Sequence, residues 1–252
     1  MSRIQSAPLM LVLGLVVLLW LYGPITQPAD YHAFADQRSW LGLPHAADVL
    51  SNLVFLLVGL HGLRRLQALP AWPGRSGYGL FYLALALTSI GSGYYHLAPD
   101  DARIVRDRLP IALACAGLLT AHWPLRWRGR VGQTAVWVGL ALFSVAWWQY
   151  TAGLGQGDLR PYLLMQLLPL LLLPLLQWLT AEDAARRYRV GLAMLLYVAA
   201  KLCELADGWL LLQLSCLSGH TLKHLLAGLA AWLLCPRLTE LESAKRLASR
   251  QA

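Results

Sequence analysis

The chain is organised as long apolar blocks that carry almost no charge. A helix needs about 20 consecutive apolar residues to cross a bilayer, and each block is close to that length. The composition agrees, because 58% of the 252 residues are hydrophobic and only 13% are charged. We therefore predict an all-α polytopic membrane protein with eight transmembrane helices, at residues 8–25, 46–63, 77–97, 109–125, 131–150, 161–180, 190–213 and 218–235.

The distribution of positive charge between the blocks supports this topology. Cytoplasmic connections of membrane proteins are rich in Lys and Arg. Alternate connections and the tail follow that rule, with Arg64, Arg65, Arg75, Arg126, Arg128, Arg130, Arg186, Arg187, Arg189, Arg237, Lys245, Arg246 and Arg250. The pattern predicts that both termini are cytoplasmic. It also accounts for the net charge of +8 without any binding of nucleic acid.

We expect one helical bundle with short additions at its ends. Residues 1–44 are expected to form a transmembrane helix followed by an outer cap loop. No small-x-small cleavage site follows this helix, so retention is favoured over removal as a signal peptide. Residues 45–236 are expected to form the core, and residues 237–252 a cytoplasmic tail. The four cysteines have no paired spacing, which indicates neither a disulfide framework nor a cysteine-type zinc site.

Polar residues recur inside or beside the apolar blocks. An ionisable group at the bilayer centre costs about 2.5 to 3.5 kcal/mol on insertion scales, so such residues normally face a cavity or a partner. The clearest cases are Ser92, His96, Asp107, Lys201, Glu204, His220 and His224. These residues are therefore the candidates for a functional site.

The predicted topology brings three histidines and an aspartate to one depth, toward the outer face. His96 ends the third predicted helix, Asp107 precedes the fourth, and His220 begins the eighth. His220 and His224 are four residues apart and share a helix face. Three neutral imidazoles form a typical catalytic site for Zn²⁺, with a fourth position left for water. Haem is disfavoured, because two histidines one turn apart suit a small ion better.

Alternatives remain for several of these residues. Lys223 lies about 100° around the helix from His224 and is not expected to compete for the ion. Asp107 sits between two arginines and could also be a solvated loop charge. Lys201 and Glu204, three residues apart, are either an internal ion pair that stabilises the bundle or auxiliary groups at the site.

Together these motifs resemble the alkaline ceramidases, in a superfamily of seven-helix membrane hydrolases that includes the progestin and adipoQ receptors. The resemblance covers residues 48–232 and consists of DVLSNLVFLLVG, of GSGYYH with Asp107 eleven residues after His96, and of SGHTLKH. It implies a bacterial-type member with a seven-helix core, preceded by one extra transmembrane helix.

The resemblance also implies an activity, which is hydrolysis of the amide of ceramide-like membrane lipids to a sphingoid base and a fatty acid. His96, His220 and His224 are then the zinc ligands. Asp107 would orient or deprotonate the water, and Ser92 would donate a hydrogen bond to the developing oxyanion. The site would face the periplasm or lumen, and a bacterial protein would lie in the inner membrane.

The resemblance is incomplete in one segment. Alkaline ceramidases also bind calcium before the first core helix, where this chain carries Asp30, Asp36 and Asp48 without the family's tighter acidic pattern. Three other functions stay open. They are hydrolysis of another lipid amide or ester, a lipid-binding receptor or sensor of the progestin and adipoQ type, and a serine hydrolase with Ser92 as nucleophile.

Overall fold

The computed structural model describes residues 3–72, 74–123, 130–180 and 182–237, and the protein is all-α. Its helices are α1 (Arg3–Tyr22), α2 (Ala46–Ser51), α3 (Leu53–Ala68), α4 (Arg75–Leu97), α5 (Asp101–His122), α6 (Arg130–Gly153), α7 (Arg160–Leu179), α8 (Ala184–Leu205), α9 (Asp207–Leu214) and α10 (Gly219–Leu233). Each predicted apolar block coincides with one helix or with two consecutive helices. The basic connection at 124–129 and the tail at 238–252 lie outside the described residues.

Two blocks divide into two helices for identifiable reasons. Between α2 and α3, the Asn52 side-chain amide donates to the Asp48 carbonyl oxygen at 2.7 Å, which competes with the regular backbone ladder. The block at 190–213 ends as α8 at Leu205 and restarts as α9 at Asp207. The Asp207 carboxylate there accepts hydrogen bonds from backbone groups far along the chain. Tertiary contacts therefore set this break.

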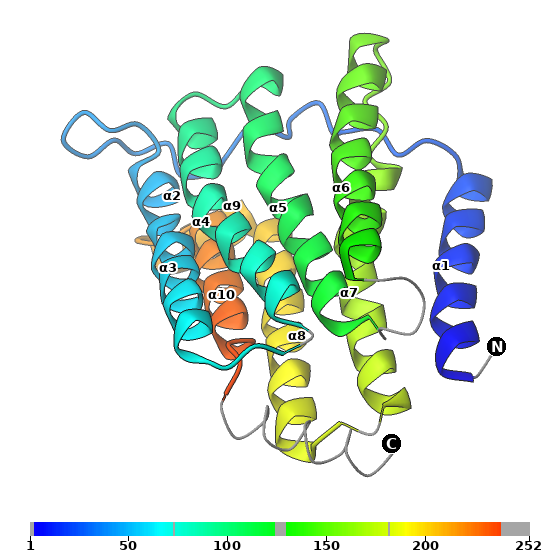
Figure 1. Ribbon diagram of the computed structural model, residues 1–252. Helices are drawn as coiled ribbons and strands as arrows, with labels where there is room; N and C mark the ends of the chain where they lie inside the picture. Colours follow the sequence, from blue (N-terminus) through cyan, green and yellow to red (C-terminus); the bar gives the residue numbers. More distant parts are fainter. Residues whose placement is uncertain (1–2, 73, 124–129, 181, 238–252) are drawn as a thin grey trace.

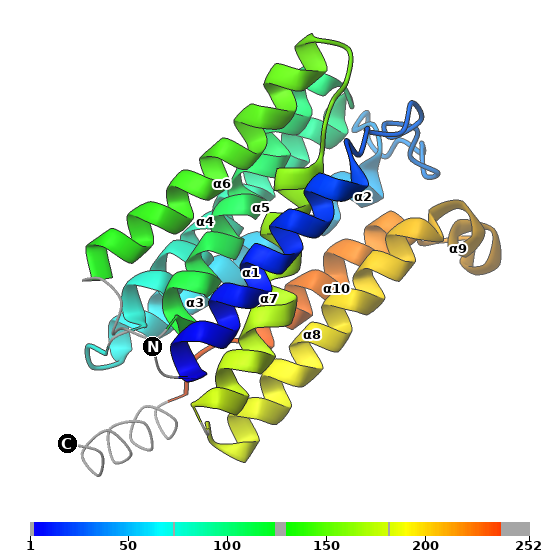
Figure 2. The same ribbon diagram turned by 90° about the vertical axis from the view of Figure 1, so that its right-hand side faces the viewer.

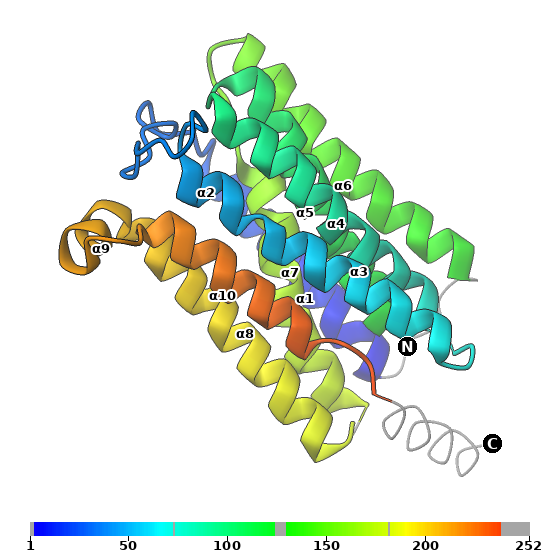
Figure 3. The same cartoon turned by 90° about the vertical axis from the view of Figure 1, so that its left-hand side faces the viewer.

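The long helices lie side by side and run alternately up and down (Figure 1). The closest pair is α4 and α5, which contact each other along much of their length. The α1 helix lies at the edge of the bundle against α7 (Figure 2). The α10 helix packs between α3 and α8 (Figure 3). The start of α1 and the end of α10 lie at the same end of the bundle, as the predicted topology requires (Figure 1).

The start of α5 differs from the sequence prediction. We expected a helix from residue 109, but α5 begins at Asp101, and Asp100 caps it by accepting from the Arg103 backbone N–H at 2.7 Å. The charged run DDARIVRD is therefore helical, although it is too polar to belong to the apolar block. As a result, Asp107 lies in the second turn of a helix, and the loop alternative for this residue is wrong.

Within the described residues, two helical segments are long and apolar enough to cross a membrane by length and composition, namely 46–68 and 160–179. A shorter apolar helix covers 6–22. Core helices of soluble proteins and signal sequences meet the same criteria, so these segments alone do not define a membrane protein. The eight membrane crossings therefore stay a prediction.

Candidate metal centre

The three predicted histidine ligands come from two helices. His96 lies in the last turn of α4, and His220 and His224 lie in the first two turns of α10. Ser218 fixes the start of α10, because its hydroxyl accepts from the Thr221 backbone N–H at 3.0 Å. Gly219 lets this start approach α8, since a Cβ at that position would lie 2.0 Å from the Cys203 carbonyl oxygen. Local capping and a close helix contact thus position two of the three imidazoles.

The three histidines form a compact, buried cluster. One ring nitrogen from each lies within 4.8 Å of the others, and all three side chains are buried. His96 Nε2 and His220 Nε2 are 3.2 Å apart. Two nitrogens that share a zinc ion at about 2.0–2.1 Å with tetrahedral angles are about 3.3–3.4 Å apart, so this spacing fits such an ion. The predicted cluster is thus present, and it can hold a metal.

A serine that the sequence analysis missed orients His224. The Ser51 hydroxyl donates to the Asp48 carbonyl oxygen at 3.0 Å, and its oxygen lies 2.7 Å from His224 Nδ1. Because the single hydroxyl proton is already used, His224 Nδ1–H is the donor in the second contact. His224 Nε2 is left with a free lone pair, as a metal ligand requires. Ser51 stands in the DVLSN motif, but the motif alone does not reveal its partner.

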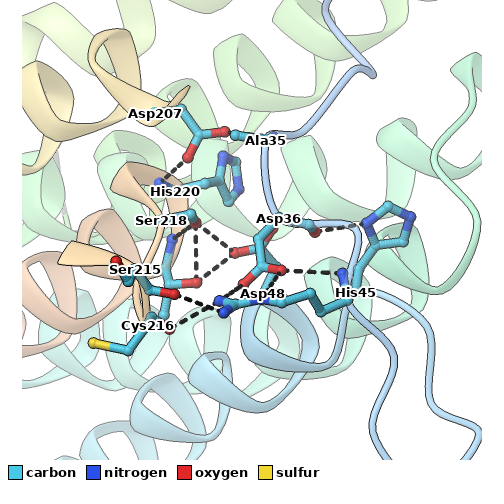
Figure 4. A network of polar contacts seen from close by, with 11 residues as sticks. Ala35, Asp36, His45, Asp48, Asp207, Ser215, Cys216, Ser218 and His220 are labelled. Atoms are coloured by element: carbon cyan, nitrogen blue, oxygen red, sulfur yellow. Dashed lines mark hydrogen bonds and ion pairs between the residues drawn. The ribbon is translucent and has the colours of Figure 1, made fainter. Parts of the chain in front are cut away.

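The segment before α2 folds over the cluster as a cap. The Phe34 ring packs against the His96 and His220 rings, with centroid distances of 4.6 and 4.4 Å. Asp207 ties this cap to α10, because its carboxylate accepts from the Ala35 N–H at 2.9 Å and from the His220 N–H at 2.7 Å (Figure 4). Sequence analysis had assigned no role to Asp207. The cap predicted for 26–45 therefore shields the histidines from solvent.

Two of the three acidic residues considered for calcium, Asp36 and Asp48, have other partners. Arg38 binds both carboxylate oxygens of Asp36, and its guanidinium also donates to the carbonyl oxygens of Ser215 and Cys216 (Figure 4). These Arg38 contacts lower the pKa of Asp36 below its usual value. Asp30 is exposed. Within the described part of the chain, only the three histidines form a group of three or more side chains close enough to bind one metal ion.

Asp48 is a residue of α2, and its side chain forms hydrogen bonds with the start of α10. Its carboxylate accepts from the Thr221 hydroxyl at 2.6 Å and from the Ser218 hydroxyl at 3.3 Å. Its backbone carbonyl accepts from Ser51, the residue that holds His224. Asp48 therefore links the first core helix to the histidine helix.

A cavity of about 170 Å³ extends from the cluster into the bundle. His224, Ser92 and Asp107 are among the polar residues that line it. The remaining wall is mainly apolar and reaches Phe81 and Leu234. The ten residues from His224 to Leu234 correspond to about 15 Å along a helix, which is roughly half of a bilayer core. The cavity thus joins a polar end to an apolar channel.

The prediction for Lys223 is wrong. Its ammonium lies 2.9 Å from His220 Nε2, because residues three apart on a helix are neighbours and the lysine stem is long. It also donates to Glu204 at 2.8 Å, and Glu204 accepts from Lys201 at 2.9 Å. The predicted Lys201–Glu204 pair is therefore formed. All three side chains also line the cavity, so the pair is at the site as well.

Comparisons of the chain with protein-family models, with curated proteins and with solved structures found no match. The functional reading therefore depends on the arrangement of the residues. What the arrangement provides is a buried cluster of three histidines that can bind a metal, and a mainly apolar cavity that both His224 and the Asp107 carboxylate line.

Proposed function

We propose that this protein is a zinc-dependent hydrolase embedded in a membrane, and that it cleaves the amide bond of ceramide-like lipids. The observation that supports this most is the combination of the three-histidine cluster with a long apolar cavity at whose head Asp107 lies. A lipid acyl chain requires such a channel, and its amide carbonyl would then lie beside the histidines. The resemblance of the GSGYYH and SGHTLKH motifs to those of alkaline ceramidases points to the same substrate class.

In the proposed reaction, water adds to the amide carbonyl carbon, the C–N bond breaks, and a fatty acid and a free amine are released. Zinc held by His96, His220 and His224 would supply Lewis-acid activation of the water and the carbonyl. Asp107 takes a proton from the attacking water and delivers it to the departing amine nitrogen. Ser92, which lines the same cavity, would hold the Asp107 carboxylate in place.

The contacts of Ser92 favour this role over that of a nucleophile. A nucleophilic serine needs a base that accepts its proton, commonly a histidine within hydrogen-bond reach. Among the described residues, no hydrogen bond joins Ser92 to a histidine, and His96 Nε2 faces His220. The Asp107 carboxylate lines the cavity, where it can accept a proton from a water molecule.

The membrane location is part of the proposal. Large apolar side chains are exposed around the bundle, for example Leu57 on α3, Ile90 on α4, Phe143 on α6 and Leu195 on α8. Such surfaces suit a lipid environment and are rare over most of a soluble monomer. Together with the alternating basic connections, they support eight crossings with both termini in the cytoplasm and the histidines toward the outer face.

The decisive experiment compares the membrane lipids of cells that express the wild type, His224→Ala or Asp107→Asn. We expect purified wild type to contain about one zinc and to deplete a lipid amide. His224→Ala should lose both properties. Asp107→Asn should keep the zinc and lose hydrolysis by about 10²- to 10⁴-fold, the usual range for a general base.

His61→Ala is the matched control, because His61 is an exposed histidine on α3, outside the cluster. It should retain both zinc and hydrolysis. Full turnover by metal-free protein would rule out the proposed mechanism, and zinc binding without any change in cellular lipids would argue against a hydrolase.

A further inference from the structure

The proposed hydrolysis does not explain the three charged side chains beside the histidines. Lys201 and Lys223 both donate to Glu204, at 2.9 and 2.8 Å, one to each carboxylate oxygen. All three line the same cavity as Asp107 and His224. The Lys201 side chain is 44% exposed, so the charged end of the cavity reaches the surface of the bundle. We call these three residues the lysine cluster.

Metal binding would direct Lys223 toward the substrate. His220 Nε2 has one lone pair, which contacts the Lys223 ammonium at 2.9 Å in this structure. A metal on His220 requires that lone pair, so metal ligation and the lysine contact exclude each other. Lys223 then keeps its bond to Glu204 and has donors available for the cavity.

The charges in the lysine cluster do not balance. Two ammonium groups share one carboxylate, which leaves one positive charge in excess. Asp107 lines the same cavity and interacts with Lys223, but in the proposed reaction it takes the proton of the attacking water and is then neutral, so it no longer offsets this charge. An unbalanced charge is costly where apolar groups replace water, and a partner of opposite sign lowers this cost. A bound anion would supply that partner.

Resting on the proposed function, we infer that the preferred substrates are lipid amides with a carboxylate next to the scissile bond, which are N-acyl amino acids. In such a lipid the carboxylate follows the amide nitrogen by one carbon. Lys223 now touches a nitrogen of the histidine cluster, so its ammonium lies within a few bond lengths of the expected amide position. A neutral ceramide presents a hydroxyl there, and an ammonium binds a carboxylate more strongly than a hydroxyl.

The test uses two substrates that differ in this group alone, N-palmitoylglycine and N-palmitoylethanolamine. We expect purified zinc-loaded protein to cleave the glycine lipid with a kcat/KM at least about tenfold higher, as one charge-assisted hydrogen bond would give. Lys201→Met should bring the two values close together by lowering the value for the glycine lipid, and its zinc content should match that of the wild type. Lys201 suits this test because its described bond is to Glu204, away from the histidines.

Tyr197→Phe is the matched control. Tyr197 lies one turn before Lys201 on α8 and lines the same cavity, and its hydroxyl donates to Gln166 at 3.0 Å. Removing this hydroxyl changes the cavity wall without changing its charge, so the preference for the glycine lipid should persist. A preference that disappears in Tyr197→Phe as well would reflect cavity shape and would overturn the inference.

Binding of non-hydrolysable analogues separates the inference from the proposed function. In these ketones, CH₂ replaces the amide NH of both lipids, and binding is read from the rise in melting temperature. Cleavage of both amides at equal rates, or a preference that survives in Lys201→Met, would overturn the inference and leave the hydrolase intact. Selective binding of the anionic ketone without cleavage of any amide, ceramide included, would support the anion site and overturn the hydrolase. Equal binding without cleavage would overturn both.

Discussion

The two ends of the helical bundle bury different kinds of group. At the site end, where α4 stops and α10 begins, the buried side chains include three histidines, two serines and Asp48, joined by hydrogen bonds. At the opposite end, which we call the glycine end, α3, α4 and α5 meet through Gly62, Gly77 and Gly117. There the helices touch backbone to backbone, as α8 and α10 also do at Gly219 of the site end, but the buried side chains around them are mainly apolar.

This difference indicates what each end contributes. Small residues let helices approach closely and stabilise a bundle through van der Waals contact, which needs no special chemistry. Buried polar groups lower stability unless they are satisfied, so a dense polar network is expected where chemistry requires it. Substitutions at the glycine end should therefore change stability, and substitutions around the histidines should change metal binding.

The largest stability effect is expected for Gly77→Ala. A Cβ there would lie 2.3 Å from the Ala121 backbone nitrogen and 2.7 Å from the Gly117 carbonyl oxygen, so two helices would have to separate. We expect a loss of about 2 to 3 kcal/mol in the free energy of unfolding, typical of overpacking. Thermal unfolding in detergent measures it, and zinc per folded protein should remain as in the wild type.

Gly79→Ala is the matched control, because a Cβ on this residue of the same helix would meet nothing within 4 Å. It should be neutral or stabilise by up to about 1 kcal/mol through helix propensity. If Gly77→Ala melted like Gly79→Ala, the close contact between α4 and α5 would not be a source of stability.

At the site end, Ser51→Ala should change zinc affinity more than it changes stability. The substitution removes the oxygen that accepts from His224 Nδ1–H and leaves the ring without its orienting partner. Loss of such a partner typically weakens metal binding by about 10- to 100-fold. Zinc titration against a competing chelator measures the affinity.

Ser144→Ala provides the comparison for a serine without a role at the histidines. The Ser144 hydroxyl is buried on α6 and donates to the Ala141 carbonyl oxygen of its own helix at 2.7 Å. Its removal should leave zinc affinity unchanged. Equal losses of affinity in both serine variants would mean that general loosening of the bundle, rather than the His224 contact, controls metal binding.

The helices were predictable because their apolar blocks have the length that a helix needs, and the histidine cluster was predictable from helical spacing combined with topology. Long-range pairing was not predictable. Asp207 reads as an isolated acidic residue, yet it holds both Ala35 and His220, and this pairing breaks the predicted helix at 190–213. The position of the Lys223 ammonium was missed because the angle between residues on one helix does not include the hydrogen bond from Lys223 to Glu204 on α8.

The smallest effect is expected for Asp158, a polar group at the site end that serves the fold. Its carboxylate joins the N-terminal segment to α6 and α7, because it accepts from the Ile25 backbone N–H at 3.2 Å, from Trp147 Nε1 at 2.9 Å and from the Arg160 guanidinium. Burial by itself raises the pKa of Asp158, but the hydrogen bonds from Arg160 and Trp147 outweigh it and lower the pKa from 3.8 to about 2.

The lowered pKa makes this contribution to stability dependent on pH. It is fully present above about pH 5, where the carboxylate is charged in both states, and it is lost progressively as the pH falls to 2 and below. We expect the wild type to lose about 1 to 2 kcal/mol over that range through this group. Asp158→Asn should be less stable at pH 6 and lose less on acidification, as measured by unfolding at each pH. The zinc affinity of this variant at neutral pH should match that of the wild type. If the zinc affinity of Asp158→Asn falls as in Ser51→Ala, Asp158 also influences metal binding. The polar groups at this end could then not be divided into those that bind metal and those that stabilise the fold.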